Sequence, residues 1–216
     1  DIGYWGDFLS NLVSADNMFC EAFLFDANLS KWHKFVPTSV LEKMGIPKVW
    51  NDPIEMLSIK KIDATHIVLV QGDEPLLLPS HLFALVDAMR KHPEDDAWNA
   101  TAPLTKISQL DEHSFVKCAV NDANNILYCF RRSPSHVNGI KQLKYIRKIL
   151  GLIAYRREVL EDITNKKSGL IEITESIEQL KLISNNYLIT SVPVDLALPS
   201  VNEKGAEEKI IRFIRN

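Results

Sequence analysis

Apolar runs of strand length alternate along this chain with longer helix-like stretches, and this alternation restricts the folds open to it. The predicted strands cover residues 20–25, 66–70, 97–102, 115–120, 126–130, 149–155 and 187–194. The predicted helices cover residues 80–91, 156–164, 172–184 and 203–215. Strands and helices in this order predict an α/β fold.

Turn and cap residues mark the ends of several predicted elements. Pro79 and Ser80 open the helix of 80–91 with the expected proline and cap chemistry, and NNYL at 185–188 closes the helix of 172–184. The polar segment NDANN (121–125) lies between two strand runs and is typical of a hairpin turn. The predicted sheet is therefore mixed.

Composition sets the size and the class of the protein. With 216 residues, of which 46% are hydrophobic, the chain can bury a full core, and a single domain over 1–216 is favoured over two small ones. A net charge of −3 gives no support for an electrostatic grip on nucleic acid or on an anionic membrane. A small-molecule partner is expected instead.

Cysteine usage and hydropathy indicate a location. The three cysteines are isolated, so neither a disulfide framework nor a CxxC metal site is predicted, and a reducing cytoplasm fits. No apolar run approaches the roughly 20 residues of a membrane span, and no charged-then-apolar signal-peptide pattern is predicted. Because the chain starts at Asp1 rather than Met, further residues are expected upstream.

The stretch HIVLVQGDEP (66–75) is the most distinctive in the chain. Its apolar run ends abruptly in a turn that carries Gln71, Asp73 and Glu74. In open α/β sheets, ligands bind beyond the carboxyl ends of the strands, and a carboxylate placed there is a natural ligand for Mg²⁺. The alternative is a solvated turn in which one acid caps the helix that begins near Pro79.

VQGDEPLL resembles the signature of the bacterial CMP-Kdo synthetases, cytidylyltransferases that activate the eight-carbon sugar acid Kdo for lipopolysaccharide assembly. Three further blocks are similar to this family and occur in its order. They are FVKCAVNDANNILYCFRRSP (115–134), GLIAYR (151–156) and IEITESIEQLK (171–181). The resemblance covers residues 66–216 and implies a single-domain nucleotide-diphospho-sugar transferase fold with a mixed central sheet flanked by helices.

Residues 1–65 depart from the family pattern. The N-terminal phosphate-binding loop (Pro-Ala-Arg, then a Pro-Gly-Lys segment) is missing, as is a His-x-Ser-Gly-Thr-Asp-Arg stretch expected between about Val49 and Ile59. In the family these segments oppose phosphate charge with backbone N–H groups and basic side chains. A chain that lacked both would bind CTP poorly. Truncation or disorder is expected to account for the first loss, and a loop left out and closed up in the numbering for the second.

The resemblance also implies the metal chemistry. The anomeric hydroxyl of the sugar acid attacks the α-phosphorus of CTP in line, and Mg²⁺ neutralises phosphate charge while pyrophosphate leaves. Asp73 corresponds to one metal-binding carboxylate. The second falls on Asn202, whose amide oxygen brings no charge, so a weaker site is expected, with Glu203 as a possible substitute.

Four residues fall on sugar-contacting positions of the family: Gln71, Arg131, Glu178 and Gln179. Arg131 is expected to pair with the sugar carboxylate, because its planar fork of donors suits two oxygens, and it is predicted with Asp73 as catalytic. The alternative for Arg131 is an exposed hairpin arginine. Glu172, Glu175 and Glu178 recur every three residues and so share one side of the predicted helix, where a solvated acidic face is the alternative.

The strand KILGLIAYR (148–156) points to an altered acceptor. The family's His and first Tyr, which hydrogen-bond the sugar, fall on Ile149 and Ile153, which cannot do so. An amino-substituted acceptor such as 8-amino-8-deoxy-Kdo is therefore predicted, with Glu178 or Glu175 pairing its ammonium group. The alternative is that both isoleucines belong to the core.

The resemblance implies a homodimer in which the region around 126–150 projects toward the partner. Two other functions stay open. One is a cytidylyltransferase for a nonulosonic acid of the sialic type. The other is a catalytically dead paralogue that binds sugar or nucleotide, which is suggested by Asn202 and by the missing phosphate loop.

Overall fold

The computed structural model describes residues 65–71, 74, 76–200 and 210, together with the strand backbones at 22–26 and 31–32. The strands are β1 (Ala22–Asp26), β2 (Lys31–Trp32), β3 (His66–Val70), β4 (Ala97–Pro103), β5 (Lys117–Val120), β6 (Ile126–Phe130), β7 (Ile146–Arg156) and β8 (Ile189–Pro193). The helices are α4 (Pro79–Lys91), the 3-10 helix η3 (Ile107–Leu110), α5 (Gly139–Gln142), α6 (Arg157–Asn165), α7 (Leu170–Glu175) and α8 (Gln179–Ser184).

The chain forms two compact units. Unit 1 comprises residues 1–72 and 154–167, and unit 2 comprises residues 73–153 and 168–216. In unit 1, β1 pairs in parallel with β3 and antiparallel with β2. Helix α6 of the same unit buries Val159, Leu160 and Ile163. The single-domain organisation of 1–216 stays a prediction.

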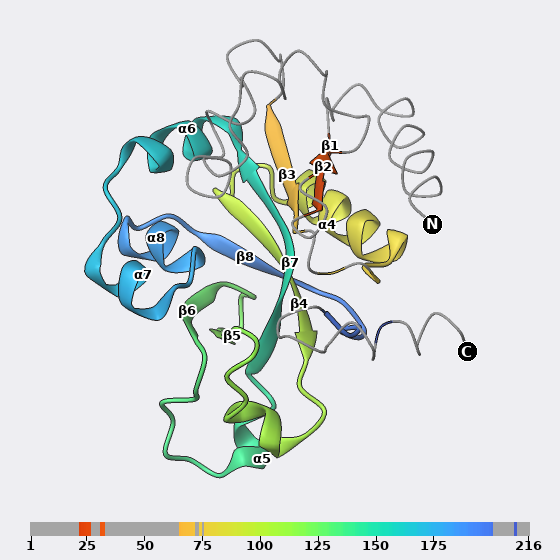
Figure 1. Ribbon diagram of the computed structural model, residues 1–216, viewed down its shortest axis with the longest axis vertical. Coiled ribbons are helices and arrows are strands. Elements are labelled where there is room, and N and C mark those ends of the chain that lie inside the picture. Colours follow the sequence, from red (N-terminus) through yellow and green to blue (C-terminus); the bar gives the residue numbers. More distant parts are fainter. Residues whose placement is uncertain are drawn as a thin grey trace. The chain divides into compact units, whose positions relative to one another are not determined.

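Unit 2 contains the larger described part of the sheet (Figure 1). Strand β4 lies between β7 and β8 in strand order and pairs with β8 in parallel, while β5 pairs antiparallel with both β6 and β7. Helix α4 packs against β4 and β8 and buries one apolar face, made of Leu82, Leu85, Val86 and Met89. Both parallel and antiparallel pairs are present, so the predicted mixed sheet with flanking helices is confirmed.

A second buried cluster supports the β5–β6 hairpin and the start of β7. Its members are Leu104, Leu110, Phe130 and Ile146, with Phe115, Ala119, Tyr128 and Leu143 packed against them. The predicted hairpin turn at 121–125 is confirmed, because Oδ1 of Asn121 accepts from the N–H groups of Ala123 and Asn125, and Asn124 takes a positive φ of 61°. Cys118 and Cys129 face each other across this hairpin, and both are free thiols.

The strand predictions agree with the structure to within a few residues, whereas one predicted helix is wrong. The helix expected at 172–184 is divided into α7 and α8, because Ser176 adopts a left-handed conformation with φ 53°. Glu178 is therefore the N-cap of α8 and does not share one helical face with Glu172 and Glu175.

Two further helix predictions concern the start of α4 and the segment 203–215. Pro79 is the first residue of α4, as expected, but Ser80 does not cap it: the N-cap is Leu78, whose N–H donates to Nδ1 of His81 at 3.4 Å. The predicted helix at 203–215 lies outside the described residues, apart from the buried Ile210.

Candidate active site

The turn after β3 holds the candidate metal ligand. Asp73 lies outside the described residues, and Gln71 is half-buried at the end of β3. Glu74, the second acid of the turn, accepts a hydrogen bond from the N–H of Gly151 at 2.8 Å through Oε1, and its own carbonyl accepts from Leu77. Glu74 therefore joins the turn to the middle of β7, a role that the sequence analysis did not assign.

Gln179 is the most deeply buried of the predicted polar sugar-contacting residues that the structure describes. Its Nε2 donates to Oδ1 of Asn99 at 2.9 Å, and Nδ2 of Asn99 donates to the carbonyls of Leu150 at 2.9 Å and Leu152 at 3.1 Å. Gln179 thus anchors α8 to β4 and β7. Asn99 was missed, although an amide within the apolar run AWNATA is a signal that the sequence carries.

Arg147 extends this polar network along the sheet. Its Nε donates to Oγ1 of Thr101 at 2.9 Å, and its Nη2 donates to the Thr101 carbonyl at 3.3 Å. The hydroxyls of Thr101 and Ser191 lie 2.7 Å apart. These contacts place the start of β7 beside the carboxyl end of β4. In open α/β sheets, ligands bind beyond the carboxyl ends of the strands.

Arg131 bridges two segments that are distant in sequence. Its Nη1 donates to the carbonyl of His113 at 3.0 Å and its Nη2 to the carbonyl of Ser176 at 3.5 Å. Since Ser176 joins α7 to α8, Arg131 lies beside the turn that carries the half-buried Glu175 and the exposed Glu178. The structure thus brings these three predicted sugar-contacting residues into one region.

The remaining predicted residues are placed as follows. Ile149 and Ile153 are both buried within β7. Gln71 belongs to unit 1, whereas the other described site residues belong to unit 2, and each group is described by itself. Asn202 lies outside the described residues.

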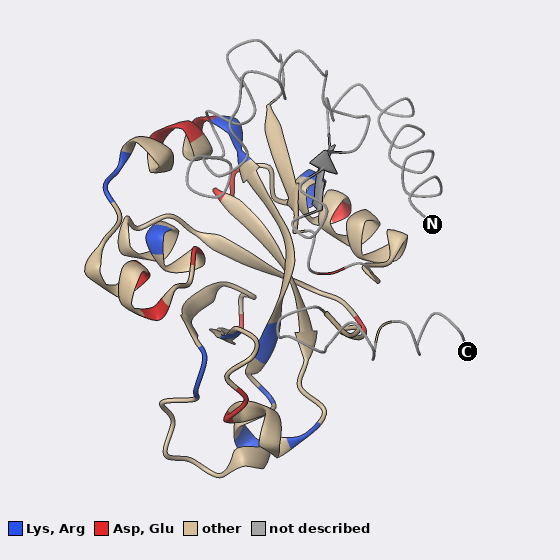
Figure 2. Cartoon of the chain, viewed as in Figure 1, with Lys and Arg blue, Asp and Glu red and all other residues tan. Residues whose placement is uncertain are grey.

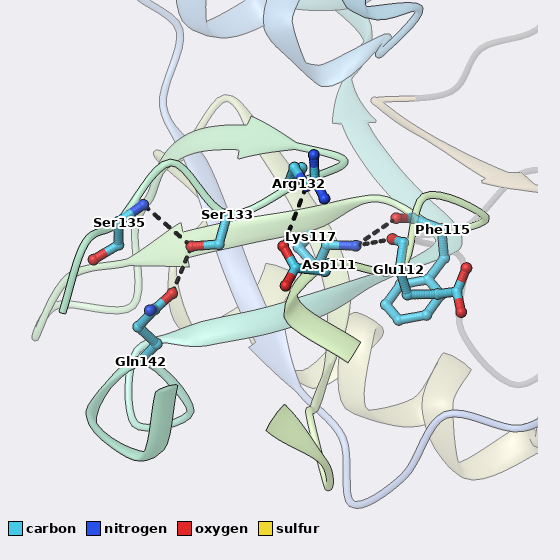
Figure 3. A network of polar contacts seen from close by, with 8 residues as sticks. All are labelled: Asp111, Glu112, Phe115, Lys117, Arg132, Ser133, Ser135 and Gln142. Carbon is cyan, nitrogen blue, oxygen red and sulfur yellow. Dashed lines mark hydrogen bonds and ion pairs between the residues drawn. The ribbon is translucent and has the colours of Figure 1, made fainter. Parts of the chain in front are cut away.

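Lys117 is a buried charge that the sequence analysis missed. Its Nζ donates to the carbonyls of Glu112 and Phe115 (Figure 3) and lies 4.3 Å from the centroid of the Phe115 ring. Burial lowers the pKa of Lys117 to about 8, against the opposing effect of the Glu112 carboxylate. A lysine inside the apolar run FVKCAV was the signal available in the sequence.

Comparison with known proteins identifies the family. The family model for cytidylyltransferases matches residues 24–191. A 3-deoxy-manno-octulosonate cytidylyltransferase of Chlorobium phaeobacteroides (strain DSM 266 / SMG 266 / 2430) is 30% identical over 82% of this chain and 76% of its own length. The chain belongs to the cytidylyltransferase family. An Escherichia coli protein with the same name is 31% identical over 69% of this chain and 60% of its own length.

A solved structure shares the fold of this cytidylyltransferase. It is a CMP:2-keto-3-deoxy-manno-octonic acid synthetase complexed with CTP, with 28% identity and a TM-score of 0.67, covering 73% of this chain and 65% of that one. The likeness confirms the predicted fold class. The matches to the E. coli protein and to the solved structure span less than two thirds of those relatives' length.

Within the described part of the cytidylyltransferase, no group of three or more His, Cys, Asp or Glu side chains is arranged to hold a metal ion. A surface cleft of about 600 Å³ lies between α4 and the start of β8, lined by residues that include Asp87, His92 and Thr190. None of the predicted site residues lines it. No helix in the described residues is long and apolar enough to cross a membrane.

Proposed function

We propose that this protein transfers CMP from CTP to the anomeric hydroxyl of Kdo or an amino-Kdo variant, releasing pyrophosphate, for lipopolysaccharide biosynthesis. The observation that carries the proposal is the family match over residues 24–191, together with the likeness to a synthetase complexed with CTP. The sugar oxygen forms a bond to the α-phosphorus, the bond from that phosphorus to the bridging oxygen breaks, and the hydroxyl proton passes to solvent.

Mg²⁺ is the proposed cofactor. Asp73 and Asn202 would hold it, and their carboxylate and amide oxygens are of the hard type that Mg²⁺ prefers. When bound, the ion would neutralise charge on the phosphates. Glu74 is not proposed as a ligand, because Oε1 of its carboxylate already accepts from Gly151.

The proposed acceptor contacts come from the segments around β7 and the α7–α8 turn. Arg131 would meet the sugar carboxylate, and Gln71 and Gln179 would meet hydroxyls. Glu175 forms no ion pair among the described residues, so it or Glu178 is proposed to pair the ammonium of 8-amino-8-deoxy-Kdo. Ile149 and Ile153 would give this acceptor an apolar neighbour.

Two further properties are proposed. The protein would act in the cytoplasm, which fits the free thiols of Cys118 and Cys129. It would form a homodimer through the region around 126–150, where Leu127 and Ile140 are exposed apolar side chains.

The test uses the full-length protein with CTP, Mg²⁺ and equal concentrations of Kdo, its 8-amino analogue and a sialic-type nonulosonic acid. CMP-sugar formation is measured for each acceptor. Preference for the 8-amino analogue is expected. Preference for the nonulosonic acid would replace the proposed acceptor, and no product with any of them would favour the paralogue that only binds.

Asp73→Asn tests the proposed metal ligand. The variant should lose most CTP-dependent pyrophosphate release, on the order of 100-fold or more as for other charge-stabilising groups, because an amide brings no charge to the ion. The matched control is Asp87→Asn, which changes an exposed carboxylate paired with Lys91 on α4. Near-normal release by Asp73→Asn would contradict the assignment.

A further inference from the structure

Two lysines lie directly opposite each other in the core of unit 2. Lys117 of β5 pairs in register with Lys148 of β7, so both side chains point to the same face of the sheet. Their exposed fractions are 0% and 9%. Like charges directly opposite each other destabilise a pair of strands.

The two ammonium groups differ in their partners. Lys117 donates to the carbonyls of Glu112 and Phe115. The side chain of Lys148 has no hydrogen bond or ion pair within the described part of the chain, and its Nζ lies 5.3 Å from the centroid of the Phe115 ring. The lysine is thus nine-tenths buried, and its ammonium group lies near an aromatic face.

The surrounding charges leave an excess of positive charge. The carboxylate of Glu112 accepts from Ser114, and that of Asp111 pairs with Arg132 at 3.3 Å (Figure 3). The charge of Arg131 also acts on Lys117. In Figure 2 the start of β7 is coloured for Lys and Arg. No described carboxylate thus pairs with Lys148.

We propose that Lys148, with Lys117 and Arg131 around it, binds the carboxylate of the sugar acid acceptor. The ammonium of Lys148, which has no described hydrogen-bond partner, matches a singly charged carboxylate. A triphosphate would need several donors and a metal ion. The start of β7 also lies beside the end of β4, where ligands bind in α/β sheets. This assignment rests on the proposed function, and it takes the acceptor to the face of β7 that Lys148 shares with Lys117 in place of the opposite face, which carries Ile149 and Ile153.

The test is the steady-state kinetics of Lys148→Met in the full-length protein. We expect the KM for the sugar acid to rise by about 10- to 100-fold, the loss typical of one charge-assisted contact, with the KM for CTP unchanged. Lys148→Arg should restore part of the loss. Lys144→Met, which changes an exposed lysine just before β7, is the matched control and should leave both constants unchanged.

A second measurement separates binding from folding. Titration calorimetry compares the sugar acid with its carboxamide analogue: wild type should prefer the acid, and this preference should be smaller in Lys148→Met, where Arg131 remains. The melting temperature of the unliganded variant should equal or exceed that of wild type, because an unpaired buried charge is removed. A purely structural lysine would instead lower it.

The outcomes are distinguishable from a failure of the proposed function. If wild type forms no CMP-sugar, the proposed function itself fails. If wild type is active and Lys148→Met keeps its KM for the sugar acid and its preference for the carboxylate, the assignment of Lys148 is overturned. A rise in the KM for CTP, or a loss of pyrophosphate binding in place of sugar binding, overturns it as well, because the site then holds phosphate.

Discussion

Lys117 shows how a single buried charge makes folding depend on pH. Burial lowers its pKa in the folded protein from 10.5 to about 8. Between these two values the unfolded chain binds more protons at this residue than the folded protein does. The contribution of Lys117 to the free energy of unfolding therefore rises with pH across this window.

The measurement is urea unfolding at pH 8 and at pH 10.5 for wild type and Lys117→Met. Tyrosines and cysteines also titrate in this range, so the informative quantity is the difference between the two proteins. Wild type should gain more stability on going to the higher pH than Lys117→Met does. Equal changes in both proteins would show that the lysine is not desolvated in the folded state.

Glu74 acts at the scale of whole elements, because it ties the turn after β3 to the buried β7. Glu74→Ala leaves the N–H of the buried Gly151 without its acceptor, at a cost of about 1–3 kcal/mol in the free energy of unfolding. Glu74→Gln keeps an acceptor oxygen and should lose less. Glu94→Ala, in the exposed loop after α4, is the control, and urea titrations compare all four proteins. A loss no larger than that of the control would contradict this role.

The break between α7 and α8 marks a limit of local sequence patterns. Residues 172–184 contain no Gly or Pro and have helical periodicity, so one helix was predicted. In the structure Ser176 adopts the left-handed conformation, Ile177 and Gln179 are buried, and Arg131 donates to the Ser176 carbonyl. Arg131 is distant in sequence from this segment, so the residue pattern of the segment alone does not predict the break.

At the scale of the whole molecule, local features were predicted from the sequence, whereas contacts between distant segments were not. Strands 66–70 and 126–130 were predicted with their observed bounds, because each is a short apolar run flanked by polar turns. The family resemblance singled out Arg131 and Gln179, whose role in binding the sugar stays a prediction. The facing of Lys117 and Lys148 and the bond from Glu74 to Gly151 depend on which strands become neighbours, which local periodicity does not specify.

Because Cys118 and Cys129 face each other inside the hairpin, their rate of alkylation can report how often the sheet opens. Burial raises the pKa of Cys118 to about 12 and that of Cys129 well above its usual value, so almost no reactive thiolate exists in the native state. In a Cys20→Ser protein, alkylation should therefore proceed only through molecules whose sheet has opened. The labelling rate should rise with urea in step with unfolding. Rapid labelling without denaturant would instead mean that the hairpin opens independently of the rest of the sheet.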